Sequence, residues 1–338
     1  MTSMRRIVLA SRPEAAPGPE NFRLEEAPLP EPAEGEALVR VRWLSLDPYM
    51  RGRMSAGPSY AAPVEIGETM TGQGVGEVIA SRAEGLAQGD MVLGSFGWAD
   101  HGCAPARELR KLDARLPPST ALGVLGMPGF TGWVGLMEHG RPQPGETLVV
   151  AAATGPVGSM VGQIAKSQGL RAIGIAGGED KCRLATETFG FDACLDHRAH
   201  PDARSLRKAL ARAAPDGIDI YFENVGGKVL EAVIPLMNDF GRIPLCGTIA
   251  WYSGDEGGPD RLPTLWRSIL VKRLAVRGFI VTDHWNRVGE FLAEAAPKVA
   301  AGEIRYLEDV TAGLENAPAA FLKMLAGGNT GKTLVSLG

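Results

Sequence analysis

The sequence is poor in the residues that metal or disulfide cross-links require. Its 338 residues include only 4 cysteines and 5 histidines, and no two cysteines stand in a CxxC arrangement. A structural zinc loop of four closely spaced cysteines is therefore excluded. A few scattered cysteines in a chain of this length are typical of reduced thiols in the cytosol, so we expect a cytoplasmic protein.

Long apolar runs and an excess of one charge sign are also missing. No run approaches the roughly 18 apolar residues that suggest a membrane span. The four apolar residues 7–10 (IVLA) are fewer than the roughly 7–15 of a signal peptide. The 35 Lys and Arg residues against 39 Asp and Glu residues give a net charge of −4. We therefore expect neither nucleic-acid nor membrane binding.

The chain divides into regions that differ in the pattern of their glycine, proline and apolar residues. Up to about residue 122, glycine and proline separate short alternating runs such as 36–44 and 74–80, which predicts a strongly turned β domain. Beyond it, buried-strand runs such as 147–153 alternate with helical segments such as 156–168. Repeated β–α units of this length predict an α/β domain with a doubly wound parallel sheet. A helix over about 283–301 and a short strand at 333–337 follow, and we expect the strand to pack on the first domain.

The first strand–helix junction of the second region carries a dinucleotide fingerprint, residues 153–158 (ATGPVG). Gly155 lets the backbone approach a pyrophosphate, Gly158 allows close packing of helix on strand, and Pro156 and Val157 open the helix whose amides face the phosphates. The alternative, an ordinary tight turn, is disfavoured because the glycines lie between a predicted strand and an amphipathic helix.

The end of the next strand distinguishes the two nicotinamide cofactors. An NAD enzyme usually has an acidic residue there for the ribose 2′-hydroxyl, whereas this chain has Gly177 and Gly178 followed by Lys181. Glycine leaves room for a 2′-phosphate and lysine supplies charge, which favours NADPH. The alternative is a solvated lysine that Glu179 and Asp180 offset.

Together with these motifs, several others resemble the prostaglandin reductase (leukotriene B4 12-hydroxydehydrogenase) family, which belongs to the zinc-independent medium-chain dehydrogenases/reductases. Bacterial curcumin reductases and plant alkenal double-bond reductases share them. The resemblance is carried by residues 46–54 (LDPYMRGRM), 126–133 (GMPGFTGW), 153–166, 174–182, 223–227 (ENVGG) and 328–332 (GNTGK).

The resemblance implies a GroES-like catalytic domain over 1–122 and 283–338, joined to a Rossmann domain over 123–282, with the active site in the cleft between them. It also implies a homodimer formed through the Rossmann domains. The pyrophosphate loop falls on 155–158, and Gly178 and Lys181 fall at the 2′-phosphate. His197 stands where the family often has a tyrosine that holds this phosphate. Residues at positions that line the nicotinamide half are Asn224, Cys246, Gly247, Thr248, Ile249, Phe279, Ile280, Val281 and Asn329.

Catalytic zinc is not expected. The region where zinc-dependent relatives have a His-Glu pair, residues 66–72 (IGETMTG), contains no histidine. His101 and Cys103 are two possible ligands, which are too few for a site. Without a metal, the natural hydride acceptor is a carbon–carbon double bond conjugated to a carbonyl. The protein must then supply a donor to the oxygen on which charge accumulates.

The resemblance assigns that role to Tyr252, with Tyr49 as a second candidate. A phenol is suitable because it donates a hydrogen bond while neutral. The competing interpretations are an exposed loop aromatic for Tyr252 and a packed turn for Tyr49. We therefore expect an NADPH-dependent enal/enone reductase; the alternatives are an NADPH:quinone reductase and a non-catalytic NADPH-binding protein.

Overall fold

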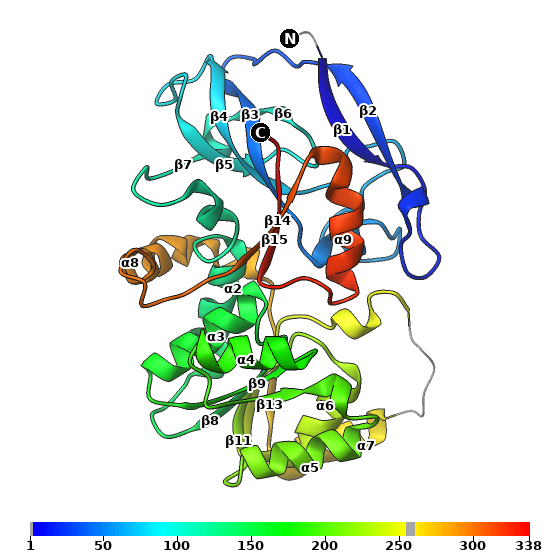
Figure 1. Ribbon diagram of the computed structural model, residues 1–338, viewed down its shortest axis with the longest axis vertical. Coiled ribbons are helices and arrows are strands. Elements are labelled where there is room, and N and C mark those ends of the chain that lie inside the picture. The colour runs from blue at the N-terminus through cyan, green and yellow to red at the C-terminus, as the bar shows by residue number, and fades with distance from the viewer. Residues whose placement is uncertain (1–2, 255–260) are drawn as a thin grey trace. The chain divides into compact units, whose positions relative to one another are not determined.

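The computed structural model describes residues 3–254 and 261–338, and the chain forms two compact units (Figure 1). Unit 1 comprises Met1–Gly126 and Glu308–Gly338, and unit 2 comprises Met127–Leu307. Among the residues described, no helix is both long and apolar enough to cross a bilayer.

Unit 1 is built on a β-sheet in which strands run in the order β14-β15-β3-β4-β5-β7, with β6 also paired to β3. Glycine and proline end these strands early, which is why the sheet turns so often. As expected, the C-terminal strand β15 packs on this unit: it lies antiparallel to β3 and parallel to β14. The elements are β1 (Ser3–Leu9), β2 (Phe22–Pro28), β3 (Glu36–Ser45), α1 (Tyr49–Arg53), β4 (Gln73–Ser81), β5 (Met91–Ser95), β6 (His101–Pro105), β7 (Arg110–Lys111), β14 (Glu308–Ala312), α9 (Ala317–Leu325) and β15 (Lys332–Ser336).

Unit 2 contains the predicted doubly wound sheet. In the described part of the chain its six strands are all parallel and run in the order β10-β9-β8-β11-β12-β13. This is the Rossmann order 3-2-1-4-5-6, so the α/β prediction is confirmed. Figure 1 shows α3 and α4 on one face and α5, α6 and α7 on the other.

The strands of unit 2 are β8 (Thr147–Ala151), β9 (Arg171–Ala176), β10 (Ala193–Asp196), β11 (Ile218–Phe222), β12 (Met237–Leu245) and β13 (Ala275–Gly278). Its helices are α2 (Met127–Val134), α3 (Pro156–Ser167), α4 (Glu179–Glu187), α5 (Ala203–Ala213), α6 (Gly227–Val233), α7 (Leu262–Lys272) and α8 (Val288–Ala300). Short turns that matter below are η4 (Gly135–Gly140), η5 (His197–Ala199), η7 (Ile249–Trp251) and η8 (Val281–Arg287).

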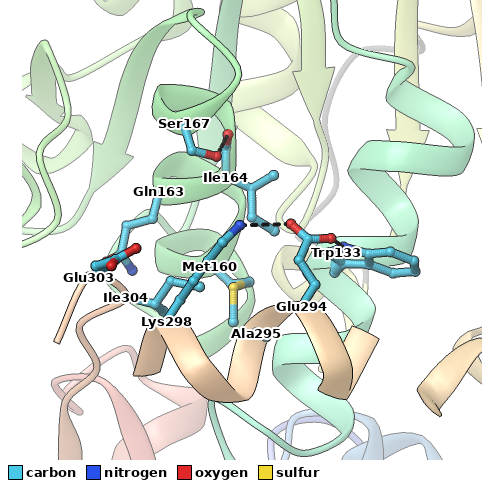
Figure 2. A pocket seen from close by; sticks show the side chains of 10 residues that line it. All are labelled: Trp133, Met160, Gln163, Ile164, Ser167, Glu294, Ala295, Lys298, Glu303 and Ile304. Carbon is cyan, nitrogen blue, oxygen red and sulfur yellow. Dashed lines mark hydrogen bonds and ion pairs between the residues drawn. The ribbon is translucent and has the colours of Figure 1, made fainter. Parts of the chain in front are cut away.

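The second boundary between the units lies later than 282/283, because α8 packs within unit 2. Glu294 on α8 accepts a hydrogen bond from the Trp133 indole, 2.9 Å. Just after α8, the amide of Gln163 on α3 bonds both backbone groups of Arg305, at 2.8 and 2.9 Å. Figure 2 shows α8 side chains facing those of α2 and α3. The helix expected in the first domain thus belongs with the parallel sheet.

Candidate functional site

Most of the predicted cofactor residues gather at one edge of the unit 2 sheet. Because all six strands are parallel, their carboxyl ends share that edge, where doubly wound folds bind nucleotides. The fingerprint follows β8, Gly178 and Lys181 follow β9, His197 follows β10, and Asn224 follows β11. Residues 246–249 follow β12 and residues 279–281 follow β13. Asn329 and Tyr49 belong to unit 1.

The fingerprint turn leaves the first turn of α3 without a side-chain cap. Gly155 is the N-cap of α3 and has no side chain to cover the first-turn amides, and Pro156 begins the helix. A Cβ on Gly158 would lie 2.3 Å from the carbonyl oxygen of Ala152, so any side chain there would push helix and strand apart. Backbone amides and the positive end of the helix dipole are thereby left open to phosphate.

Cationic side chains converge beside the end of β9. A Cβ on Gly177 would lie 2.9 Å from Nε of Arg198 and 3.0 Å from Nε2 of His197, so the absence of a side chain lets both groups pack against the glycine. Asp196 fixes the surrounding backbone, since its Oδ1 accepts the N–H groups of both Gly178 and Arg198 at 2.8 Å. Lys181 is half-buried on the first turn of α4.

His197 is held as a neutral ring in this cluster. Burial lowers its pKa first, and the charges of Lys228 and Arg198 lower it further. Lys228 also fixes its backbone, donating to the carbonyl oxygens of His197 and His200 at 2.8 and 2.6 Å. Sequence reasoning missed Arg198 and Lys228; the signal for Arg198 was a cation directly after the third strand, next to His197.

The loops after β11 and β12 are joined to each other and to β8. The Asn224 amide donates to the carbonyl oxygen of Ala151, 2.9 Å, and the Asn224 carbonyl accepts from the N–H of Ile249, 3.3 Å. Burial raises the pKa of the Cys246 thiol to about 12, so this group stays protonated. These hydrogen bonds join the two loops to each other and to β8 at the carboxyl edge of the sheet.

Tyr252 ends the short turn η7 and is half-buried. Its hydroxyl oxygen lies 3.2 Å from where a Cβ on Gly247 would be, so the phenol reaches back to the loop after β12. The exposed-loop interpretation is therefore disfavoured, since only part of this side chain faces solvent.

The three residues that follow β13 differ in burial. Phe279 packs on the rings of His139 and Phe222, at centroid distances of 4.9 and 6.3 Å. Ile280 and Val281 are half-buried. Phe279 is therefore part of the packed interior, whereas Ile280 and Val281 are only partly covered.

In unit 1, Tyr49 begins α1 directly after a buried ion pair. Burial raises the pKa of its phenol, so the group is neutral. Asp47 Oδ1 lies 2.6 Å from Lys332 Nζ, and both residues are buried. Asn329 donates to the carbonyl oxygen of Gly331, 2.9 Å. The motifs 46–54 and 328–332 thus meet at one ion pair.

Among residues 3–254 and 261–338 there is no group of three or more His, Cys, Asp or Glu side chains that could hold a metal ion. His101 is buried, with its Nδ1 2.9 Å from Asp100, and Cys103 lies two residues further along β6. Both residues of this pair thus lie on the same strand of unit 1.

A small cavity of about 100 Å³ lies between α3 and α8 (Figure 2). The Glu294 carboxylate on its wall already accepts from Trp133 and Lys298, both at 2.9 Å. A space of this volume holds a few water molecules, since one water occupies about 30 Å³. It is not a candidate for the substrate site.

Comparison with known proteins adds to this geometry. Residues 5–112 match a family described as "N-terminal domain of oxidoreductase", and residues 156–296 match one described as "Zinc-binding dehydrogenase". The chain is 53% identical to the NADPH-dependent curcumin reductase of Escherichia coli over 98% of this chain and 96% of that protein.

It is 40% identical to a 2-alkenal reductase (NADP(+)-dependent) of Nicotiana tabacum, with 89% and 87% covered. It is 39% identical to prostaglandin reductase 1 of Rattus norvegicus, with 95% of each covered. The solved structure of CurA from Vibrio vulnificus in complex with NADPH superimposes with a TM-score of 0.93 at 51% identity, covering 99% of both chains.

Proposed function

The chain belongs to the medium-chain dehydrogenase/reductase superfamily, in the family that contains the curcumin, 2-alkenal and prostaglandin reductases. On this premise we propose that it reduces the α,β carbon–carbon double bond of enals and enones with NADPH. The observation that carries the proposal is the cationic cluster at Gly177, on the same sheet edge as the fingerprint and the Tyr252 loop. The similarity to an NADPH-dependent curcumin reductase and to an NADP(+)-dependent 2-alkenal reductase supports the same proposal.

The residues present fit this cofactor. The N–H groups of Val157 and Gly158, in the first turn of α3, would hold the pyrophosphate. Lys181, His197 and Arg198 would hold the 2′-phosphate beside Gly177, where a Cβ would collide with His197 and Arg198. NADPH, when bound, supplies the hydride for the reaction. Asn224, residues 246–249, Ile280 and Val281 would line its nicotinamide half.

Two tyrosines are proposed to act on the substrate. As hydride adds to the β-carbon, negative charge develops on the carbonyl oxygen, and a neutral phenol can donate to it. We assign this role to Tyr252, whose hydroxyl lies at Gly247 next to the loop proposed for the nicotinamide. Tyr49 is the second candidate, because burial keeps its phenol protonated at neutral pH.

The test is Tyr252→Phe, with Tyr60→Phe as a matched control at an exposed tyrosine. Loss of one oxyanion donor lowers turnover about 10²-fold or more, whereas NADPH affinity, followed by the quenching of protein fluorescence, is expected to stay within about twofold because the cofactor phosphates are held elsewhere. Unchanged enone turnover in Tyr252→Phe would remove this residue from the mechanism. Turnover of a quinone only, or of nothing, by the unaltered protein would favour the two alternatives.

We also propose a homodimer formed through unit 2. Strand β13 is the last strand of the sheet, and every residue in it is exposed. Beside it, α7 presents Leu270 and Trp266 at 76% and 61% exposure. An exposed edge strand with apolar neighbours is a pairing site, and a second copy of the chain would extend the sheet across it.

Sedimentation or light scattering of the protein tests the dimer. Val276→Lys, at an edge position of β13 that is 43% exposed, is expected to give a folded monomer, and Val310→Lys on β14 of unit 1 serves as the control. A monomeric unaltered protein would contradict this part of the proposal and leave the reaction untouched. We also propose a cytoplasmic location, as predicted from the cysteine content.

A further inference from the structure

Glu223 is a buried carboxylate to which the proposed reaction gives no role. It directly follows β11 and is 1% exposed. A buried carboxylate is costly unless it is hydrogen-bonded, and Oε1 accepts two backbone N–H groups, from Val225 at 2.6 Å and from Gly226 at 2.9 Å. Burial raises the pKa of this carboxyl. The side chain thus holds the turn that follows its own strand.

The backbone of Glu223 joins the ends of two strands. Its N–H donates to the carbonyl oxygen of Pro244, 2.9 Å, in a bridge next to the end of β12. Its carbonyl oxygen accepts from the N–H groups of Cys246 and Gly247, at 2.9 and 3.2 Å. These bonds do not need the carboxylate, so they would survive a change of side chain.

The carboxylate reaches the next loop through the turn it holds. The carbonyl oxygen of Val225 accepts from the N–H of Ala250, 2.9 Å. Gly226 has a φ of 79°, and a Cβ there would lie 2.7 Å from the Trp251 ring, so the ring packs on the glycine backbone. Tyr252 is the next residue, and its N–H donates to Ile249, 3.3 Å. The turn therefore supports the whole of η7 and the residue that ends it.

We propose that Glu223 is a positioning residue, whose carboxylate fixes the turn at Val225 and Gly226 and, through that turn, the place of the Tyr252 phenol. The inference rests on the proposed function in naming Tyr252 as the hydrogen-bond donor. It adds that the geometry of this donor depends on a residue that touches neither cofactor nor substrate. Glycine has more conformational freedom than any other residue, which is why an internal acceptor is needed to keep this turn in one conformation.

A merely stabilising carboxylate makes a different prediction. Its loss would lower the unfolding temperature and leave turnover per folded molecule unchanged. A positioning carboxylate changes turnover, and it does so only while Tyr252 has its hydroxyl. Residues that act as a unit in this way show effects that do not add.

The experiment is a double-mutant cycle of Glu223→Met and Tyr252→Phe, with Glu187→Met on the exposed end of α4 as the control. Glu223→Met is expected to lower kcat for an enone about tenfold or more, and to lower it by less than about twofold when Tyr252→Phe is already present. Glu223→Gln keeps an acceptor oxygen for the two N–H groups and is expected to restore most of the turnover. Equal losses in both backgrounds would overturn the proposal.

Hydrogen exchange of the protein without cofactor gives a second readout that does not depend on activity. Peptides covering residues 248–253 are expected to exchange faster in Glu223→Met than in the unaltered chain or in Glu187→Met; unchanged exchange there would also overturn the proposal. If Glu223→Met does not fold, Glu223→Asp replaces it, because the shorter side chain withdraws the carboxylate from the turn. An unaltered protein that reduces no enone would refute the proposed function alone, since hydrogen exchange still reports on the turn.

Discussion

Replacing Lys332 by methionine should destabilise unit 1 strongly. Lys332 is 2% exposed, and its ammonium group donates to Asp47 Oδ1 at 2.6 Å and to the carbonyl oxygen of Leu46 at 2.7 Å. Its loss would leave the Asp47 carboxylate buried, with the hydroxyl of Ser45 on its other oxygen as the remaining partner. Removing one partner of a buried ion pair typically costs about 3–5 kcal/mol.

That free energy sets the expected change in thermal unfolding. For a domain of about 150–250 residues, 1 kcal/mol shifts the midpoint by about 2–4 °C, so Lys332→Met should lower it by about 6–20 °C. The assay is thermal unfolding followed by circular dichroism, with urea unfolding to give the free energy at one temperature.

The double variant Asp47→Asn/Lys332→Met distinguishes an unpaired charge from lost packing. It removes the stranded carboxylate charge, so it should recover more than half of the loss. A shift below about 2 °C for Lys332→Met, or a double variant no more stable than the single one, would refute the reasoning. Because this pair joins the motif around Tyr49 to the one containing Asn329, a confirmed result would also explain why both motifs occur together.

Three further predictions concern unit 2. Gly158→Ala should abolish NADPH binding in calorimetry and lower the melting temperature, since its Cβ would lie 2.3 Å from a backbone oxygen; a normal affinity would contradict the assigned phosphate loop. Arg198→Ala and Lys181→Ala should each raise the KM for NADPH about tenfold, as charge-assisted hydrogen bonds at half-exposed sites do, and spare NADH; equal effects on both cofactors would disprove a 2′-phosphate site. Burial lowers the pKa of His139, whose Nε2 lies 3.3 Å from Nε2 of His284. Because the unfolded chain then binds a proton more tightly, the free energy of unfolding should decrease as the pH drops below 6.5. In His139→Gln this decrease should be smaller, and the same pH profile in the variant and the unaltered protein would contradict the prediction.

The periodicity of the sequence was sufficient to predict a doubly wound parallel sheet. The apolar run 171–176 between glycine turns predicts a strand, and β9 occupies it from Arg171 to Ala176. The run 241–247 also predicts a strand, but β12 begins earlier, at Met237. The first residues of β12 include Phe240, whose φ is 64°. No local sequence pattern predicts a phenylalanine in the left-handed region.

Long-range contacts account for what sequence reasoning missed. Arg198 joins the cationic cluster at Gly177 because β10 lies beside β9. Helix α8 has an ordinary amphipathic pattern, which does not show the unit on which it packs. It packs in unit 2 through contacts such as the hydrogen bond from the Trp133 indole to the Glu294 carboxylate, between residues 161 positions apart. Glu223 could not be singled out either, since an acidic residue after a strand looks the same whether it binds a ribose or its own turn.

The measurement that tests the central claim most directly is the oxidation of NADPH, followed at its near-ultraviolet absorbance, against a long-chain alkenal, a 15-keto-prostaglandin-like enone, curcumin and a simple quinone, each repeated with NADH. We predict turnover of the enal or enone substrates with a clear preference for NADPH, and a saturated carbon–carbon bond in the product. Turnover of the quinone alone, or tight NADPH binding with no turnover of any substrate, would contradict the account.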